Sequence, residues 1–547
     1  MAKYADLKVA LLATEARVRG LEKVVNKYIP FEQDGIIYNL YDLPDGFVIR
    51  GNLDLKKKGL TKLPDLSKVT IEGNFDCEGN ELLTSLKGAP QKVGGFFNCS
   101  DCGLTALDTA TSEVGRYFNC DGNELLTSLK GAPQKVSGFF NCSNCGLTTL
   151  EGAPQEVGGD FYCGSNGLTS LKGAPQKVGG SFECHFNRLT TLEGAPQEVG
   201  GHFKCHYNHL TTLKGAPQEI SGWFDCSHNQ LTSLEFAPQK VSGVFRCENN
   251  KLTSLKGAPQ EVGKGFWCYE NRLTSLEGAP QKVGEGFICS RNKLTTLEGA
   301  PQEVGEDFDC NHNKLADLEG APQKVGGSFW CNENQLISLK GAPREIKGSL
   351  ECCNNLLTTL EGGPEKVGRR FLCTSNQLTS LEGAPRTIGE NFVCDYNKLT
   401  TLEGAPQEVG TSFTCDHNNL TSLDGAPQKV GGYFKCDHNN ELTSLFGVPP
   451  LEKGQKIYCD ETLGNKYEFT YTERSGILYE DLVRNVLYQR EVAMNKVLYP
   501  RKMENAALKR ELKKAKPQKN KKSVAEATQA TKAKFEEWLK TQNTAEK

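Results

Sequence analysis

The chain has 547 residues, of which 37% are hydrophobic and 24% are charged, and its formal net charge at pH 7 is -3. This near-neutral balance excludes a general electrostatic attraction to nucleic acid or to an anionic membrane surface. No apolar run reaches the roughly 18 residues that a membrane-spanning helix needs. Charges are scattered through the N-terminal residues, where a secretory signal would have an apolar core. We therefore expect a cytoplasmic protein with no membrane partner.

The N-terminal segment, residues 1–45, is predicted to contain a helix followed by a cap. An apolar stripe steps by 4 and 3 residues, as in a heptad pattern, through Leu7, Leu11, Thr14, Val18, Leu21, Val25 and Tyr28. The helix should end at Ile29-Pro30, because proline cannot continue it. Two interpretations remain open. Residues 1–28 form a coil that makes a homo-oligomer, or the helix shields the first unit of the repeat array that follows.

Residues 46–460 repeat the phrase G-x-F-x-C-x-x-N-x-L-x-x-L at intervals of 21 residues. Two early intervals are one residue longer, at Glu81 and at Glu124. The G-x-F-x-C part alternates, so Phe203 and Cys205 point to one side of a short strand and their neighbours point to the other. Gly-Ala-Pro then disfavours a helix on the return path. Each unit is thus one coil of a solenoid, and its apolar side chains are buried only by stacking on neighbouring coils.

This pattern resembles the leucine-rich repeat superfamily, in the short, 21-residue, proline-containing form of bacterial and bacteriophage proteins. Phenylalanine and cysteine stand where that family usually has leucine. The resemblance covers about residues 46–460, or about twenty coils. It implies a right-handed β-solenoid with a parallel sheet on the concave side and a mostly irregular convex side. Such a fold implies binding but does not identify a ligand.

The chain has 22 cysteines, and most occupy the same inward position of the repeat. We predict buried free thiols in a reducing compartment, because disulfides within an in-register ladder would distort the strands. The pairs Cys99–Cys102 and Cys142–Cys145 have the C-x-x-C spacing of zinc sites. Their second cysteines fall in the asparagine position, however, and the pairs lie two coils apart, which is too far for tetrahedral zinc. We expect no metal and no cofactor.

A charged position two residues after the proline alternates in sign along most of the array. The alternation runs from Lys92 to Lys366 and breaks once, at Glu198 and Glu219. Stacked at one coil spacing, such residues would form ion pairs between coils, each worth about 0.2–1 kcal/mol. We therefore interpret this flank of the solenoid as structural.

Variation between coils is concentrated at the outward positions of the strand: three and one before the cysteine, one after it, and the next. We predict that this concave face binds the partner, because exposed aromatic side chains are costly without one. The candidate partner-binding residues are Phe96, Tyr117, Phe139, Tyr162, His185, His202, His206, Tyr207, Trp223, His228, Trp267, Tyr269, Trp330, Asp395, Asp416, Tyr433 and Asp437. The competing interpretation is that these positions varied without selection after the repeat was duplicated, because the surface tolerates substitution.

The charge of that face narrows the predicted partner. Sixteen acidic residues stand there against five basic ones, so a phosphate backbone would be repelled, whereas a basic polypeptide or a glycan would fit. His185 and His206 occupy the same position on adjacent strands, where they could share a metal or respond to mild acid. Asp395, Asp416 and Asp437 likewise form a ladder that could hold a cation or titrate upward.

The last part of the chain departs from the repeat. Residues 461–500 are predicted to form a C-terminal cap, and residues 501–547 a basic tail with a terminal helix that could contact an acidic or nucleic-acid partner. No catalytic constellation emerges, so we expect no enzymatic activity. The sequence favours a non-enzymatic scaffold that binds a protein or glycan. The alternative is an assembly component of a large complex such as a phage virion, oligomerised by the N-terminal heptads.

Overall fold

The computed structural model describes residues 28–109, 111–443, 445, 447–449 and 457–460. These residues belong to the first of two units into which the chain divides, Met1–Leu463 and Gly464–Lys547. The predicted helix before Pro30, the C-terminal cap (461–500) and the basic tail (501–547) lie outside the described residues.

A β-hairpin precedes the first coil. Strands β1 (Pro30–Gln33) and β2 (Ile36–Asn39) pair antiparallel, and the short 3-10 helix η2 (Leu40–Asp42) follows. The rings of Phe31, Tyr38 and Phe47 meet at centroid distances of 5.0–6.1 Å, with Phe31 and Phe47 in contact with the hydrophobic core. The hairpin therefore anchors the start of the solenoid, a role that the sequence predicted for residues 1–45 without indicating this element.

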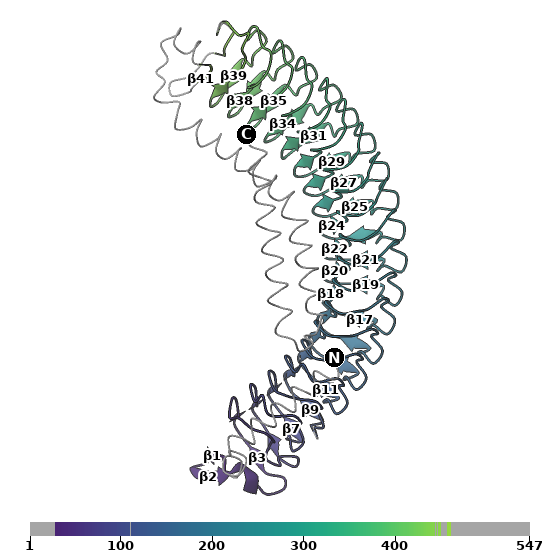
Figure 1. The fold of residues 1–547 in the computed structure, drawn as a ribbon, viewed down its shortest axis with the longest axis vertical. Coiled ribbons are helices and arrows are strands. Elements are labelled where there is room, and N and C mark those ends of the chain that lie inside the picture. The colour runs from purple at the N-terminus through teal and green to yellow at the C-terminus, as the bar shows by residue number, and fades with distance from the viewer. Residues whose placement is uncertain (1–27, 110, 444, 446, 450–456, 461–547) are drawn as a thin grey trace, which may run out of the picture. The chain divides into compact units, whose positions relative to one another are not determined.

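The G-x-F-x-C segments form one parallel sheet, called the main sheet below. It corresponds to the predicted concave sheet, and consecutive coils contribute neighbouring strands (Figure 1). Its strands are β4 (Leu53–Asp54), β6 (Phe75–Asp76), β8 (Phe97–Asn98), β10 (Phe118–Asn119), β12 (Phe140–Asn141), β14 (Phe161–Tyr162), β16 (Phe182–Glu183), β18 (Phe203–Lys204), β20 (Phe224–Asp225), β22 (Phe245–Arg246), β24 (Phe266–Trp267), β26 (Phe287–Ile288), β28 (Phe308–Asp309), β30 (Phe329–Trp330), β32 (Leu350–Glu351), β34 (Phe371–Leu372), β36 (Phe392–Val393), β38 (Phe413–Thr414), β40 (Phe434–Lys435) and β41 (Ile457–Tyr458).

The register of the main sheet places identical repeat positions side by side. Phe203 pairs with Phe182 on one side and with Phe224 on the other. Each phenylalanine of the strands and each cysteine from Cys77 to Cys436 in the repeat position is fully buried. The core is thus a stack of equivalent layers, and no coil could bury its own apolar side chains alone. The predicted parallel solenoid is confirmed for the described coils.

The return path also contains short parallel strands, where the sequence predicted a mostly irregular convex side. One sheet comprises β3 (Val48–Ile49), β5 (Thr70–Ile71), β7 (Lys92–Val93), β9 (Glu113–Val114), β11 (Lys135–Val136), β13 (Glu156–Val157), β15 (Lys177–Val178) and β17 (Glu198–Val199). The other comprises β19 (Glu219–Ile220), β21 (Lys240–Val241), β23 (Glu261–Val262), β25 (Lys282–Val283), β27 (Glu303–Val304), β29 (Lys324–Val325), β31 (Glu345–Ile346), β33 (Lys366–Val367), β35 (Thr387–Ile388), β37 (Glu408–Val409) and β39 (Lys429–Val430).

The two return sheets are separated where the charge alternation breaks. Strand β17 carries Glu198 and β19 carries Glu219, and these two strands do not pair, although β15–β17 and β19–β21 do. Elsewhere the alternation forms the predicted ion pairs, such as Lys92–Glu113 and Lys135–Glu113, both at 2.9 Å. Like charges on adjacent strands are destabilising, which accounts for an interruption at this step.

An asparagine ladder closes the turn after each main-sheet strand. Asn208 Nδ2 donates to the carbonyls of Cys184 at 3.0 Å and Cys205 at 3.1 Å, while its Oδ1 accepts from the Leu189 amide at 3.0 Å. The Cys184 carbonyl also accepts from Asn187, so neighbouring asparagines share their acceptors. The buried carbonyls of Cys184 and Cys205 and the Leu189 amide are thereby hydrogen-bonded, as a stacked solenoid requires.

The two C-x-x-C pairs belong to this ladder and not to a zinc site. Cys102 Sγ donates to the Cys77 carbonyl at 3.2 Å, and Cys145 Sγ donates to the Cys120 carbonyl at 3.3 Å. Each follows a coil with one inserted residue. In those two coils the leucine amide bonds within its own coil, from Leu83 to the Asn80 carbonyl and from Leu126 to the Asn123 carbonyl, both at 2.9 Å. The residue at the asparagine position of the next coil therefore has no leucine amide to accept from. It needs only to donate a hydrogen bond to the cysteine carbonyl of the preceding coil, which a thiol can do.

Candidate functional site

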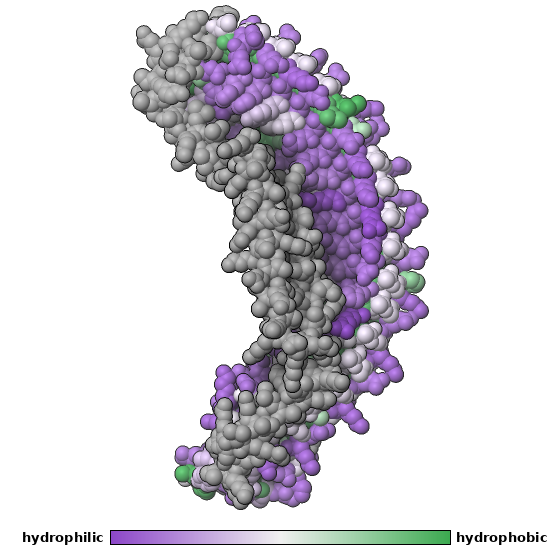
Figure 2. Space-filling view, in the orientation of Figure 1, coloured by the Kyte–Doolittle hydropathy of each residue, from purple (hydrophilic) through white to green (hydrophobic). Residues whose placement is uncertain are grey.

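The outer face of the main sheet is built from four rows of side chains, one residue per coil in each row. Each row is counted from the buried repeat cysteine that follows the main-sheet strand, such as Cys205. The entry row lies three residues before this cysteine and the strand row one before it. The turn row lies one residue after it, and the loop row two after it. These side chains are not required for the core, which the phenylalanine, cysteine and leucine positions fill. In Figure 2 the visible surface of the described coils is mostly hydrophilic, with small hydrophobic patches.

Loop-row residues adopt a left-handed backbone conformation. Phe186, Tyr207 and His228 have φ values of 52°, 51° and 52°, which bulky residues rarely adopt. Their rings stack in succession at centroid distances of 4.5 and 4.1 Å. Sequence reasoning grouped this row with the strand. The signal that could have separated it is Gly79 and Gly122 in the same position of other coils.

A second set of rings lies beside this stack, on the turn row. The imidazoles of His185 and His206 are parallel, with centroids 4.8 Å apart, and both make edge contacts to Phe186. The His185 ring covers Gly164, where any Cβ would come within 3.0 Å of it. Burial lowers the pKa of His185, and it lowers the pKa of His206 to about 4. Both rings are therefore neutral near pH 7.

The entry row carries two further groups of rings. Phe96, Tyr117 and Phe139 stack at 4.6 and 4.3 Å. Farther along, His202 contacts Trp223 at a centroid distance of 5.3 Å, and its Nδ1 accepts a hydrogen bond of 2.8 Å from the Trp223 amide. That bond fixes the His202 tautomer with its proton on Nε2. The entry row thus combines ring stacking with hydrogen bonds between coils.

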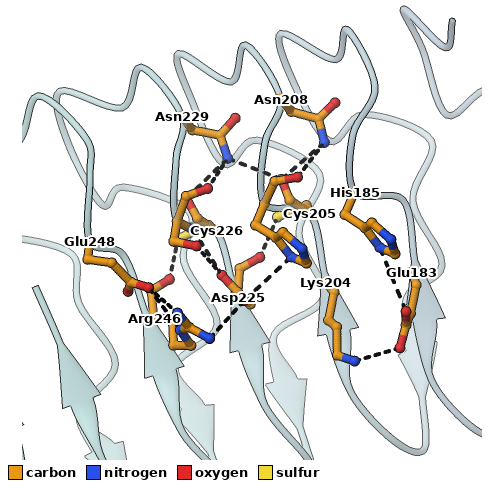
Figure 3. Close-up of polar contacts among 12 residues, drawn as sticks. Glu183, His185, Lys204, Cys205, Asn208, Asp225, Cys226, Asn229, Arg246 and Glu248 are labelled. Atoms are coloured by element: carbon orange, nitrogen blue, oxygen red, sulfur yellow. Dashed lines mark hydrogen bonds and ion pairs between the residues drawn. The ribbon is translucent and has the colours of Figure 1, made fainter. Parts of the chain in front are cut away.

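Ion pairs run across the strand and turn rows (Figure 3). Lys204 Nζ lies 2.7 Å from Glu183 Oε1, and Arg246 bonds to the fully buried Glu248, with Asp225 Oδ2 at 3.6 Å from its guanidinium. Arg246 also lies over the Trp267 ring, 4.7 Å from its centroid. The predicted acidic character of the face is therefore partly neutralised. Of these residues, only Trp267 was a candidate from the sequence.

The aspartate ladder is a buried network near the C-terminal end of the described coils. Asp395 Oδ1 accepts from the Asp416 amide and Asp416 Oδ1 from the Asp437 amide, each at 2.9 Å. Lys435 forms an ion pair with Asp416. Burial, reinforced by the neighbouring Asp395 carboxylate, raises the pKa of Asp416 to about 8. These carboxylates are bound to backbone amides of the following coils, so they serve the structure as well as the face.

The sequence candidates do not converge on one site. Six candidates of the coils that contain Cys184, Cys205 and Cys226 form three contacting pairs, namely His185–His206, His202–Trp223 and Tyr207–His228. The remaining candidates lie in other coils: Phe96, Tyr117, Phe139 and Tyr162 before this cluster, and Trp267, Tyr269, Trp330, Asp395, Asp416, Tyr433 and Asp437 after it. The list of candidates omitted Phe186, Lys204, Arg246 and Glu248, although the sequence places all four at outward positions of the same face. Their contacts include ring stacking, ion pairs and a cation–π contact.

Among the described residues, no group of three His, Cys, Asp or Glu side chains is arranged to hold a metal ion. Burial raises the pKa of the ladder thiols, as at Cys163 and Cys226, which keeps them protonated and unreactive. No helix in the described part of the chain is long and apolar enough to cross a membrane.

Comparisons with known proteins concern the fold. No family model matches the chain, and no curated protein matches it. Among solved structures, YopM from Yersinia enterocolitica WA-314 is similar with a TM-score of 0.44 and 19% identity, over 75% of this chain and 91% of that one. The leucine-rich effector protein YopM from Yersinia pestis has a TM-score of 0.32 and 17% identity, over 75% and 88%. The LRIM1/APL1C complex gives 0.34 and 15%, over 77% and 80%.

These TM-scores are low, so the fold class rests on the repeat itself. Leucines at fixed positions, an asparagine ladder and a parallel sheet with one strand per coil recur along the described residues. The described part of the chain is a parallel β-solenoid whose repeat resembles the leucine-rich repeat.

Proposed function

We propose that this solenoid is a non-enzymatic recognition scaffold that binds a polypeptide on the outer face of the main sheet. One observation carries the proposal. Phe186 and Tyr207 are 48% and 39% exposed, and both occupy the strained loop row, where most other coils have glycine or a polar residue. The frame therefore does not require a ring there, and an exposed ring in a costly conformation is typical of a binding surface.

The surroundings of these rings favour a polypeptide as the ligand. Trp223 is 38% exposed on the entry row of the same coils, and aromatic anchors of this kind dominate protein interfaces. Ion pairs such as Glu183–Lys204 lie beside them at partly buried positions. An extended peptide could cross successive coils and contact one row after another. The free, buried thiols of the core also fit a protein that works in a reducing compartment.

Selection of a displayed random-peptide library against the full chain tests the proposal. The best enriched peptide, made synthetically with a fluorescent label, is then titrated with wild type and with the variant Phe186→Ser/Tyr207→Asn. These replacements are residues that the chain itself carries in the loop row, at Ser165 and Asn249, so the fold should be kept. We expect the affinity to fall by about tenfold or more, the effect of losing one aromatic anchor.

The matched control is Ile337→Thr/Leu356→Gln, which removes two exposed apolar side chains (58% and 44% exposed) that belong to none of the four rows. The peptide should bind this variant as it binds wild type. A chain that enriches no peptide, or a peptide whose affinity falls equally in both variants, would contradict the proposed function.

A further inference from the structure

The strand row contains two tryptophans in acidic surroundings, and only one has a cation beside it. At Trp267, the Arg246 guanidinium lies over the ring and bonds to Glu248. At Trp330, the neighbours in register are Asp309 on β28 and Glu351 on β32. Within the described residues, Trp330 makes no ring or cation contact, and neither Asp309 nor Glu351 forms an ion pair.

The two carboxylates beside Trp330 are held in place on the face. Asp309 Oδ1 accepts from the Asn311 amide at 2.9 Å, and Glu351 Oε2 accepts from Asn332 Nδ2 at 3.2 Å. Two loop-row side chains nearby contact other carboxylates: His312 lies 2.9 Å from Glu333, and Arg291 Nε lies 3.9 Å from Glu270 Oε1. Burial also raises the pKa of Asp309, and the Asn311 amide, the Ser290 hydroxyl, His312 and Arg291 only partly offset this effect.

From this comparison, and resting on the proposed function, we infer that Asp309, Trp330 and Glu351 form a subsite for an arginine side chain of the bound polypeptide. The internal precedent at Arg246 shows the chemistry: the face of an indole accepts the flat guanidinium, and a carboxylate takes its N–H donors. Arginine is favoured over lysine because a planar group can stack on the ring and bond to a carboxylate at the same time.

Fluorescein-labelled tetra-arginine and tetra-lysine amides, titrated against the full chain at low salt, test this subsite. We expect tetra-arginine to bind more tightly than tetra-lysine. Asp309→Asn/Glu351→Gln should weaken tetra-arginine binding by about tenfold, since two charge-assisted contacts are lost. Trp330→Leu keeps both carboxylates and should abolish the preference for arginine over lysine.

The control Glu277→Gln/Glu319→Gln removes the same amount of charge from exposed positions that pair with Lys256 and Lys340. It should change the affinity by less than about twofold, as expected for exposed pairs. Equal weakening by both double variants, no arginine preference in wild type, or no binding at all would overturn the inference. The library-selected peptide distinguishes this failure from failure of the proposed function: its dependence on Phe186 and Tyr207 is measured separately and does not require Asp309 or Glu351.

Discussion

Replacing Asn208 with alanine is expected to lower the free energy of unfolding of its coils by about 3 kcal/mol. The side chain accepts from the Leu189 amide and donates to the carbonyls of Cys184 and Cys205, all within the solenoid wall. The two carbonyls keep a second asparagine donor, Asn187 for Cys184 and Asn229 for Cys205. The buried Leu189 amide loses its acceptor, and a cavity adds to the cost. Hydrogen exchange of the Leu189 amide, together with the urea midpoint, measures the effect.

The matched control is Cys145→Ala, at the same repeat position. There the preceding coil is one residue longer, and its leucine amide is bonded to the Asn123 carbonyl without help from the next coil. The variant removes only weak thiol bonds, from Cys145 Sγ to the Cys120 and Ser143 carbonyls, so the loss should be about 1 kcal/mol or less. Similar losses in the two variants would contradict the role assigned to the asparagine ladder.

The aspartate ladder predicts a stability that depends on pH. The pKa of Asp416 is about 8 in the folded chain, above its ordinary value of 3.8. The folded state therefore holds the proton more tightly than the unfolded state. The stabilisation from this group is complete below pH 4 and is lost as the pH rises towards 8. Asp395, Asp437 and Lys435 face the same carboxylate, so the loss is spread over this range.

Asp416→Asn removes this titration while keeping an oxygen that can accept from the Asp437 amide. We expect the variant to gain stability relative to wild type as the pH rises from 5 to 8, by at most about 1.4 kcal/mol per pH unit. Urea unfolding of both proteins at the two pH values measures the difference. The control Asp424→Asn removes an exposed carboxylate and should leave the pH dependence unchanged. A difference in stability between wild type and Asp416→Asn that stays constant, or that shifts in favour of wild type, from pH 5 to pH 8 would contradict the account.

Much of the fold follows from positions that barely vary. Phe203, Cys205, Asn208, Leu210 and Leu213 stand at spacings that recur in nearly every coil, and all five are buried as the pattern predicts. The ion pairs between return strands could be predicted for the same reason, because residues one period apart must stack. A repeat converts a spacing in the sequence into a neighbour in space, which a non-repetitive chain does not do.

Other features depend on contacts that no spacing reveals. The return strands are two residues long, as at Glu198–Val199, and so short an element leaves no periodic signal. The role of Cys102 and Cys145 depends on hydrogen bonds within the preceding coil, which the sequence does not show. The break in the charge alternation at Glu198 and Glu219 is visible in the sequence. That strand pairing also stops there could not be predicted from it.

The sequence located the face on which the candidate residues lie, but not the contacts among them. Exposed rings at variable positions indicated the face correctly as the place where the coils differ, and Tyr207 and Trp223 do lie exposed on it. The count of acidic and basic residues could not show which of them pair, as Glu183 does with Lys204 and Glu248 with Arg246. Which side chains pair on a sheet depends on their rotamers as well as on the strand register. The repeat predicts the register but not the rotamers.

The most direct test of recognition through the outer face is site-specific photocrosslinking. Benzoylphenylalanine is placed at Phe186 in one protein and at Ile337 in another, both exposed positions in the wild type, and each is irradiated with the peptide that the library selects. The account predicts that the peptide crosslinks efficiently at position 186 and not at position 337. Crosslinking at position 337 alone, or to the same extent at both positions, would contradict it.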